Sequence, residues 1–351
     1  MVATRCMTYN QAPYIKDALH GFIIQEISFP SVFIIVDDAS TDTEPDILRQ
    51  WVIDNLQVND NSNIWKEMPY GQLAVAPLRN NNQSLFVILL LSENHFQRNK
   101  MKLRYLTEWI SHSKYHAICE GDDFWLDPQK LMKQVQYLET HSKCYYLFTD
   151  RYIKNEIKST CYIQRYSKQR YDTHDILSGL IPGLQTVMFP MSLTGEVQEA
   201  MNTIKFVNGD RLYPYIASKH GEIHCLSIIS SAYRITGKGM STSVLEKDWF
   251  FHASKDFYLF HQETGFNDNW AYRKGMSNYI GSFFKQNLFR CLFFPISKLY
   301  HELKKINPLI TRWDCMMMIF FFLKRKATTI THMIIHGNNS ISFSVNTTDS
   351  Q

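Results

Sequence analysis

The chain has 351 residues, of which 45% are hydrophobic and 20% are charged. This composition is ordinary for a globular protein and excludes a disordered or fibrous one. The net charge of +4 is too small to indicate nucleic-acid binding, so we expect no nucleic-acid partner. At about 150 residues per domain, the length predicts two domains, or one large domain with an appendage.

The seven cysteines are scattered singly and form no CxxC pair. This pattern argues against a disulfide framework or a zinc site and favours a reduced, cytosolic chain. The first residues contain no long apolar stretch typical of a signal peptide. The longest apolar run, Cys315–Leu323, is far shorter than the ~20 residues of a spanning helix. We therefore expect a chain that is soluble or bound peripherally to a membrane.

The first quarter of the chain alternates between strand and helix patterns. Val2–Met7 is a short apolar run, and Val32–Val36 is a continuous β-branched and aromatic run typical of a strand buried on both faces. Helical spacing of apolar residues marks Tyr14–Gln25, which follows Pro13, and Glu44–Leu56. This alternation predicts a parallel α/β sheet.

The middle of the chain continues the pattern less regularly. Asn59–Asn82 is polar and rich in asparagine, and we predict a loop there. The apolar run Leu85–Leu91 fits either a strand or a turn of helix. Further helices are predicted at Lys100–Ser111, from Pro128 to about Glu139, and at Asp210–Lys219, and further strands at His116–Cys119, Tyr145–Thr149, Gln185–Phe189 and Ile223–Tyr233.

The last third, from about Trp249, is aromatic and has helical spacing, and the tail after Ile335 is polar and expected to be loose. Between Lys285 and Lys326 nine basic residues face only two acidic ones, and pairs and triplets of phenylalanine lie among them. Basic residues interleaved with bulky apolar ones suit a helix lying on an anionic membrane surface. A helical appendage packed on the main domain with a solvated basic face fits the pattern equally well.

Two pairs of adjacent carboxylates follow predicted strands, Asp37-Asp38 and Asp122-Asp123. Ligands of open α/β sheets bind at the carboxyl ends of the strands. Neighbouring carboxylates repel and need a proton, hydrogen-bond donors or a metal, and Mg²⁺ or Mn²⁺ suits their oxygens. A single pair of this kind is more often a helix cap or a turn. Gly121, just before the second pair, permits close approach of a ligand to the backbone.

Four segments together resemble the inverting family-two glycosyltransferases with the GT-A fold, of the type common in bacterial surface-polysaccharide synthesis. They are Met7-Thr8-Tyr9-Asn10, Val36-Asp37-Asp38-Ala39-Ser40-Thr41-Asp42, Cys119-Glu120-Gly121-Asp122-Asp123-Phe124-Trp125, and Asn208-Gly209-Asp210 with the later Tyr233-Arg234. The first three are specific in combination, and the fourth is weaker. The resemblance covers about residues 2–245, and nothing comparable is found in residues 246–351.

The resemblance implies a fold, namely α/β of the GT-A (Rossmann-like) type, with a mostly parallel sheet flanked by helices and a helical C-terminal appendage. It divides the chain into a GT-A domain at 1–245, with a nucleotide-sugar half at 1–125 and an acceptor half at 126–245. A helical basic and aromatic region at 246–335 and a loose tail at 336–351 follow.

The resemblance also implies roles for single residues at the donor end of the site. Asp38 would accept the N3–H of a uracil, and Thr8, Tyr9 and Asn10, the residues of the first motif, would line the nucleoside site. Asp122 and Asp123 would be the metal-binding pair, and at least one of them would hold Mn²⁺ or Mg²⁺ on the donor diphosphate.

At the acceptor end, Asp210 would be the general base that takes the proton of the acceptor hydroxyl. Its alternative role is a cap for the helix that follows. Arg234 would contact phosphates, or would be a surface arginine beside a strand. Trp125 would pack beneath the sugar or in the core. His220 and His224 are expected to be structural.

The leading functional hypothesis is transfer of a sugar from a UDP-sugar to a glycan or lipid-linked acceptor, at the cytoplasmic face of the membrane. A nucleotidyltransferase is disfavoured because Met7–Pro13 contains neither glycine nor lysine for a phosphate loop. The remaining alternative is a non-catalytic nucleotide-sugar-binding or scaffolding protein that has kept the fold.

Overall fold

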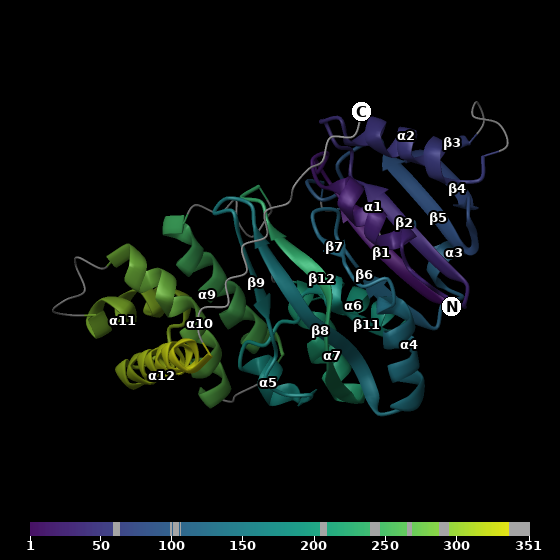
Figure 1. The fold of residues 1–351 in the computed structure, drawn as a ribbon. Helices are drawn as coiled ribbons and strands as arrows, with labels where there is room; N and C mark the ends of the chain where they lie inside the picture. The colour runs from purple at the N-terminus through teal and green to yellow at the C-terminus, as the bar shows by residue number, and fades with distance from the viewer. Residues whose placement is uncertain are drawn as a thin grey trace.

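The structure is a computed structural model that describes residues 1–58, 64–98, 100, 105, 107–203, 209–238, 246–264, 269–287 and 295–336. Within these ranges twelve strands form one sheet, with helices on both faces and a group of helices at the C-terminal end (Figure 1). The path of the sheet is β10-β12-β8-β11-β6-β1-β2-β5-β4-β3, with β7 paired to β12 and β9 paired to β8. This arrangement confirms the predicted fold class.

The centre of the sheet is parallel, as the first elements predict. It consists of β6 (Tyr115–Ile118), β1 (Val2–Thr8), β2 (Ser31–Asp37) and β5 (Asn81–Leu91), in that order. All seven residues of β2 are buried, because helices cover both faces of the sheet. The apolar run at Leu85–Leu91, which fits a strand or a helix by pattern, belongs to β5.

Successive side chains of β2 point to opposite faces of the sheet, and each face has its own core. Phe33 and Ile35 pack in a cluster with residues of α1 (Ile15–Ile23), α2 (Glu44–Asn55) and α4 (Lys130–Thr140). Val32, Ile34 and Val36 pack on the other face, with Ile110 of α3 (Thr107–Ile110). The predicted helix Lys100–Ser111 is described only in this last part and at residues 100 and 105.

One prediction in this half of the chain is wrong. The segment expected to be a loop contains β3 (Trp65–Met68) and β4 (Gly71–Leu78), which form antiparallel pairs at the edge of the sheet beside β5. Gly71, Ala74, Ala76 and Leu78 are the buried positions of β4. Three of these four positions are glycine or alanine, and Pro77 interrupts the run, so the strand pattern is weak, which explains the error. Residues 59–63 lie outside the described part of the chain.

The second half of the sheet is built on two long parallel neighbours, β8 (Cys144–Asn155) and β12 (Glu222–Ile235). The short strands β7 (Phe124–Trp125), β9 (Thr160–Gln164), β10 (Arg170–Tyr171) and β11 (Met188–Pro190) add antiparallel pairs. The predicted strand Gln185–Phe189 is only partly correct, because its first residues form the 3-10 turn η2 (Leu184–Thr186). The predicted helix Asp210–Lys219 corresponds to η3 (Gly209–Arg211) followed by α7 (Leu212–His220).

The C-terminal helices are α9 (Glu246–Glu263), α10 (Asn269–Asn287), α11 (Pro295–Ile306) and α12 (Arg312–His336). Phe257, Phe283 and Leu299 belong to the same buried cluster as residues of β8, α5 (Thr173–Leu177), α6 (Ser192–Thr203) and α7. The helices therefore share a core with the second half of the sheet. No helix in the described ranges is long and apolar enough to cross a membrane. The tail from residue 337 on lies outside those ranges.

Candidate active site

The predicted acidic residues meet in one cavity of about 800 Å³ at the carboxyl ends of the central strands. Asp38 follows β2, Asp122 and Asp123 follow β6, and Asp210 lies in η3. Strand and helix positions far apart in the chain thus bring together five lining carboxylates, namely Asp38, Glu120, Asp122, Asp123 and Asp210. Such convergence of ionisable groups in a cleft is typical of a functional site.

The segment after β1 lies at the cavity, but its residues have different tasks. Thr8 is buried, and its hydroxyl donates to the side-chain oxygen of Gln11 over 3.0 Å and also contacts a Glu44 carboxylate oxygen. Tyr9 is 37% exposed and lines the cavity. Asn10 has a positive φ of 54°, and its Oδ1 accepts from the Thr41 amide at 2.7 Å. Asn10 therefore holds the turn after β2 and is not among the described residues that line the cavity.

The first acidic pair holds two loops through backbone amides. Asp38 Oδ1 accepts from the His95 amide at 2.8 Å, and Oδ2 accepts from the Phe96 amide at 3.1 Å. Asp37 Oδ2 accepts from the Ser40 amide at 3.1 Å, and burial raises the pKa of this carboxyl. The turn chemistry considered for such pairs is therefore present, yet Asp38 also lines the cavity.

Gly121 makes close contact with the segment after β1. Its amide donates to the Met7 carbonyl at 3.0 Å. A Cβ at this position would lie 2.4 Å from Thr8 Oγ1 and 2.5 Å from Gln11 Oε1, so a larger residue would displace both side chains. The neighbouring Glu120 is held by the Met7 amide at 2.9 Å, and burial raises its pKa. Gly121 thus serves packing between two loops of the site.

Both residues of the second acidic pair line the cavity, and Asp123 is also held by a backbone amide. Asp123 Oδ1 accepts from the Arg234 amide of β12 at 2.8 Å. Burial, and next the Asp122 charge, raise the pKa of Asp123 well above its usual range. Burial also raises the pKa of Asp122, with Arg234 opposing the shift. Since a buried carboxylate near a like charge is stabilised by a cation, the pair suits one.

The structure offers no complete protein-only metal site, since the described residues hold no group of three or more His, Cys, Asp or Glu side chains able to bind one ion. Mg²⁺ is usually held by one or two carboxylates together with substrate phosphates and water. Asp122, which lines the cavity, fits this kind of shared coordination, and Asp123 is the second carboxylate of the set.

Asp210 lies in the short turn η3, ahead of α7. Burial raises the pKa of its carboxyl, and the guanidinium groups of Arg5 and Arg211 oppose the shift. Arg5 is itself held near Glu120, with 3.6 Å between Nη2 and Oε1, and donates to the Tyr213 hydroxyl at 3.2 Å. The carboxyl that lines the cavity is therefore embedded in a network of buried charges.

Trp125, one of the predicted site residues, is buried in the core of the protein. The Trp125 side chain is 1% exposed, its Nε1 donates to the Gln185 carbonyl at 2.9 Å, and its ring packs edge-on against Phe22. Trp125 is absent from the described lining of the cavity, so of its two expected positions the structure shows the core.

Arg234 lines the cavity, but its guanidinium is already engaged. It pairs with Asp17, lies 3.0 Å from Glu156 through Nε, and donates to the Asp122 carbonyl at 3.2 Å. Arg234 therefore fixes the acidic loop, and contact with phosphates stays a prediction.

His220 and His224 pair with Glu196 and Glu222, at 2.6 Å and 2.7 Å, and neither is among the described residues that line the cavity.

Sequence reasoning missed Arg151 and the segment that packs on it. Arg151 lines the cavity, its Nε donates to Gln164 Oε1 at 2.9 Å, and its guanidinium lies 5.0 Å from the ring centre of Tyr233. At Gly183 an added Cβ would lie 1.7 Å from Arg151 Nη1. The adjacent Pro182-Gly183 is a turn pattern, which is the one sequence signal for this segment.

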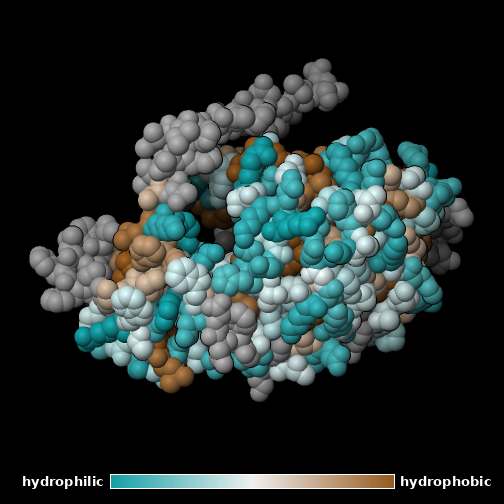
Figure 2. All heavy atoms as spheres, turned by 90° about the horizontal axis from the view of Figure 1, so that it is seen from below, coloured by the Kyte–Doolittle hydropathy of each residue, from teal (hydrophilic) through white to brown (hydrophobic). Residues whose placement is uncertain are grey.

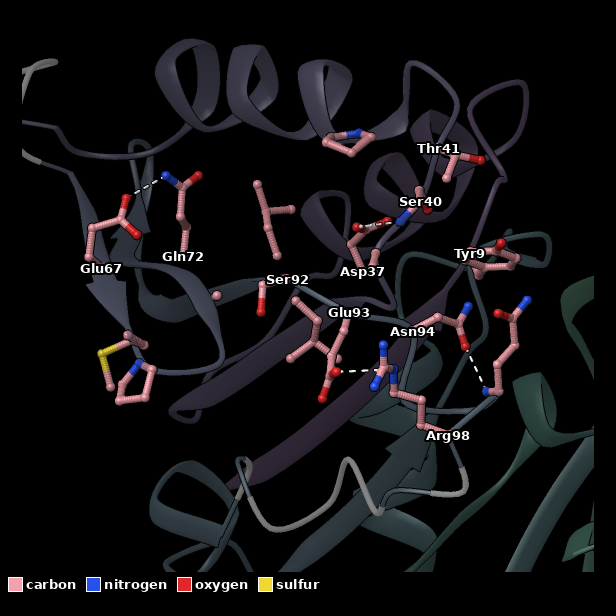
Figure 3. A pocket seen from close by; sticks show the side chains of 18 of the residues that line it. Tyr9, Asp37, Ser40, Thr41, Glu67, Gln72, Ser92, Glu93, Asn94 and Arg98 are labelled. Carbon is pink, nitrogen blue, oxygen red and sulfur yellow. Dashed lines mark hydrogen bonds and ion pairs between the residues drawn. The ribbon is translucent and has the colours of Figure 1, made fainter.

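A second cavity of about 920 Å³ adjoins the first and shares Tyr9, Asn94 and Gln97 with it. Figure 3 shows Asp37, Glu67 and Glu93 around this space, with Arg98 paired to Glu93 at 3.0 Å. The hairpin β3–β4 supplies one side of it. Because this hairpin was not predicted, the second cavity was not predicted either.

Comparison with known proteins gives matches of two kinds, although no family model matches the chain. An uncharacterized protein of Mycobacterium tuberculosis (strain ATCC 25618 / H37Rv) is 36% identical over 135 residues, which are 38% of this chain and 30% of that protein. The chain thus covers less than a third of this relative's length. A Bacillus subtilis (strain 168) protein, TuaG, whose name describes a glycosyltransferase of teichuronic acid biosynthesis, is 25% identical over 270 residues, covering 75% of this chain and 92% of TuaG.

Solved structures agree over most of the chain. S. aureus TarS 1–349 in complex with UDP-GlcNAc matches with a TM-score of 0.54 and 13% identity, covering 94% of this chain and 91% of that one. Its complex with UDP matches with a TM-score of 0.53 and 12% identity, covering 94% and 92%. At these identities the likeness establishes the fold. The chain therefore has the GT-A glycosyltransferase fold that its motifs resemble.

Proposed function

We propose that the chain is an inverting glycosyltransferase that moves a sugar from a nucleotide-sugar, most simply a UDP-sugar, to a hydroxyl group. The acceptor would be a glycan or a lipid-linked glycan in bacterial surface-polysaccharide synthesis, at the cytoplasmic face of the plasma membrane. The observation that carries the proposal is the single cavity lined by Asp38, Asp122, Asp123 and Asp210. The name of TuaG and the UDP and UDP-GlcNAc complexes of TarS support the same direction.

Recognition of the nucleoside would fall to Asp38 and Tyr9. The Asp38 carboxylate lines the cavity, and a carboxylate is a strong acceptor for an N–H donor. The N3–H of uracil is such a donor, whereas cytosine presents no N–H at that position. The half-exposed ring of Tyr9 offers a surface on which the base can stack.

The diphosphate would lie near Asp122. Asp122 and Asp123 would hold Mn²⁺ or Mg²⁺, which supplies Lewis-acid stabilisation of the charge on the departing diphosphate. Arg234 keeps the loop of this pair in place through the Asp122 carbonyl and through its own amide on Asp123.

The acceptor hydroxyl would be activated by Asp210. The carboxylate takes the hydroxyl proton while the oxygen forms a bond to the anomeric carbon. The bond from that carbon to the diphosphate oxygen breaks, and its electron pair leaves with the nucleotide, so the configuration inverts. A general base works best when its pKa lies near the working pH, and burial raises the pKa of the Asp210 carboxyl toward that range.

The experiment is calorimetric titration of the protein with UDP, GDP, CDP and dTDP, each with and without Mn²⁺. We expect UDP to bind most tightly and Mn²⁺ to strengthen its binding. As a control, exposed Asp54→Asn should titrate like the wild type. Equal affinity for UDP and CDP would contradict the role of Asp38. Tight UDP binding without turnover of any UDP-sugar would favour the non-catalytic alternative.

A further inference from the structure

The outward side of α12 carries a row of exposed apolar side chains. Trp313, Met316, Phe320 and Leu323 of the helix, and Leu309 just before it, are between 46% and 82% exposed, and we call them the α12 stripe. Within the helix their spacing of three and four residues places them on one face. Scattered exposed apolar residues are normal on a protein, but an aligned row of large ones marks a contact surface.

The opposite side of the same helix explains why the stripe faces outward. Cys315 and Met318 are fully buried in the core shared with α9 and α10. Phe321 is 9% exposed and packs edge-on against Trp270 of α10, with 4.6 Å between the ring centres. The phenylalanine triplet is thereby divided, with Phe321 buried against α10 and Phe320 exposed. The packed appendage considered for this segment thus accounts for one face of the helix, and the membrane explanation concerns the other face.

Basic residues border the α12 stripe. At about 3.6 residues per turn, Arg312 and Lys324 lie on opposite flanks of it. Lys326 and, on α11, Lys304 and Lys305 are also exposed. Figure 2 shows apolar and hydrophilic side chains side by side at the left end, where Figure 1 places α11 and α12. The surface thus combines apolar and cationic groups.

Acidic groups are few around this charge, and one of them, Glu302 of α11, pairs with Lys305 at 2.8 Å. Asp314 is the one acidic residue between Leu303 and His336 in the sequence. Its carboxylate is paired with Arg273 at 2.5 Å and accepts from the Thr311 amide at 2.7 Å. Two copies of the chain placed stripe to stripe would bring like charges together, which disfavours that contact. An anionic surface with an apolar interior has the complementary chemistry.

We propose that the α12 stripe and its basic border attach the protein to the surface of a membrane rich in anionic lipids. Trp313, Phe320 and Leu323 would enter the headgroup region, and the basic residues would contact lipid phosphates. Interfacial helices of this kind lie in the plane of the membrane and bind through apolar burial plus electrostatic attraction. The proposal does not depend on the proposed sugar transfer.

The test is co-sedimentation of the full chain with vesicles, without nucleotide, using phosphatidylcholine alone or mixed with phosphatidylglycerol. We expect binding to the mixed vesicles only. The triple variant Arg312→Gln/Lys324→Gln/Lys326→Gln should bind them about a hundredfold more weakly, since each cation near the surface contributes on the order of 1 kcal/mol. Trp313→Ser/Phe320→Ser/Leu323→Ser should weaken binding by about tenfold or more.

Matched controls use the same substitutions elsewhere on the surface. Ile157→Ser/Tyr162→Ser removes two residues that are 65% and 54% exposed, and Lys16→Gln/Lys66→Gln/Lys158→Gln removes three exposed cations. Both should bind vesicles like the wild type, and melting curves verify that every variant is folded. Wild-type binding by both stripe variants would overturn the proposal. A stripe variant that changes its oligomeric state in light scattering but binds vesicles like the wild type would also overturn it. That result would indicate that the stripe contacts a protein instead.

Discussion

The cavity is lined by two groups of residues that are held in different ways. The first group, Met7 to Asp123, contains carboxylates fixed by backbone amides of neighbouring loops. Asp38 accepts from His95 and Phe96, Glu120 from Met7, and Asp123 from Arg234. The second group, Arg151 to Lys238, includes Arg151, which is held by a side-chain oxygen and an aromatic ring.

The two groups therefore differ in what fixes them, namely loop amides in the first group and side chains from distant segments for Arg151 in the second. The carboxylates of the first group lie in short segments directly after β2 and β6 and are fixed there by loop amides. A guanidinium over a tyrosine ring depends on side chains from distant segments and can change with them. We therefore expect the first group to fix the nucleotide and the second to act on the acceptor, and the following variants test that division.

The largest effect is expected in the second group, for Asp210→Asn. Asparagine keeps the shape but cannot take the acceptor proton, so turnover should fall by about 10²–10⁴. UDP affinity should stay within about twofold in calorimetry, because the base does not touch the nucleotide in our proposal. Asp54→Asn, an exposed position on α2, is the matched control. Full turnover by the Asp210 variant would assign the base elsewhere.

The next effect concerns Asp122→Asn in the first group. Without this carboxylate Mn²⁺ should no longer strengthen UDP binding, so the affinity for UDP measured with Mn²⁺ should fall by about tenfold or more. The affinity measured without metal should change little. Titrations with and without Mn²⁺ measure both quantities. A gain with Mn²⁺ equal to that of the wild type would show that the metal, if bound, is held by other groups.

The predictability of the molecule follows the same division. Asp38 and Asp122 could be predicted because each follows a buried parallel strand, and such strands end at one edge of a sheet. Arg151 could not be predicted, since its place depends on β8 continuing to Asn155, whereas the predicted strand ends at Thr149. Its contact with Tyr233 also requires the register of β8 and β12, which contains irregularities that no local pattern shows.

Two other errors have local physical causes. The β3–β4 hairpin was missed because its buried positions are mostly glycine and alanine and its surroundings are rich in asparagine. Trp125 could not be assigned from its motif, because the choice between core and cavity depends on Phe22 and the Gln185 carbonyl. The residue type predicts that the ring is buried, but only the packing shows that it lies in the core.

A smaller effect is expected for Asp38→Ala, which leaves the His95 and Phe96 amides without their acceptor. An unpaired buried amide costs about 1–3 kcal/mol, so the free energy of unfolding should fall by at least that amount. Hydrogen exchange at His95 and Phe96 should become faster, while the amides of β8 keep their protection. Unchanged exchange at both positions would mean that the loop is held without Asp38.

The smallest effect is expected for Asp123→Asn, which should raise the stability of the fold. Burial and Asp122 raise the pKa of Asp123 well above its unfolded value, so its folded form favours the protonated state. The contribution of Asp123 to stability is then present at low pH and is lost as the pH rises through the folded pKa. Asparagine resembles the protonated acid and can still accept from the Arg234 amide through Oδ1.

Asp123→Asn should therefore raise the melting temperature at pH 8 by about 2–4 °C and change it less near pH 4. Asp54→Asn, which is exposed, should show no such pH dependence. Loss of stability at pH 8 in the Asp123 variant would mean that the ionised carboxylate is stabilised in the folded chain. A gain at pH 8 together with weaker UDP binding would mean that the ionised form is maintained for ligand binding, at the expense of stability.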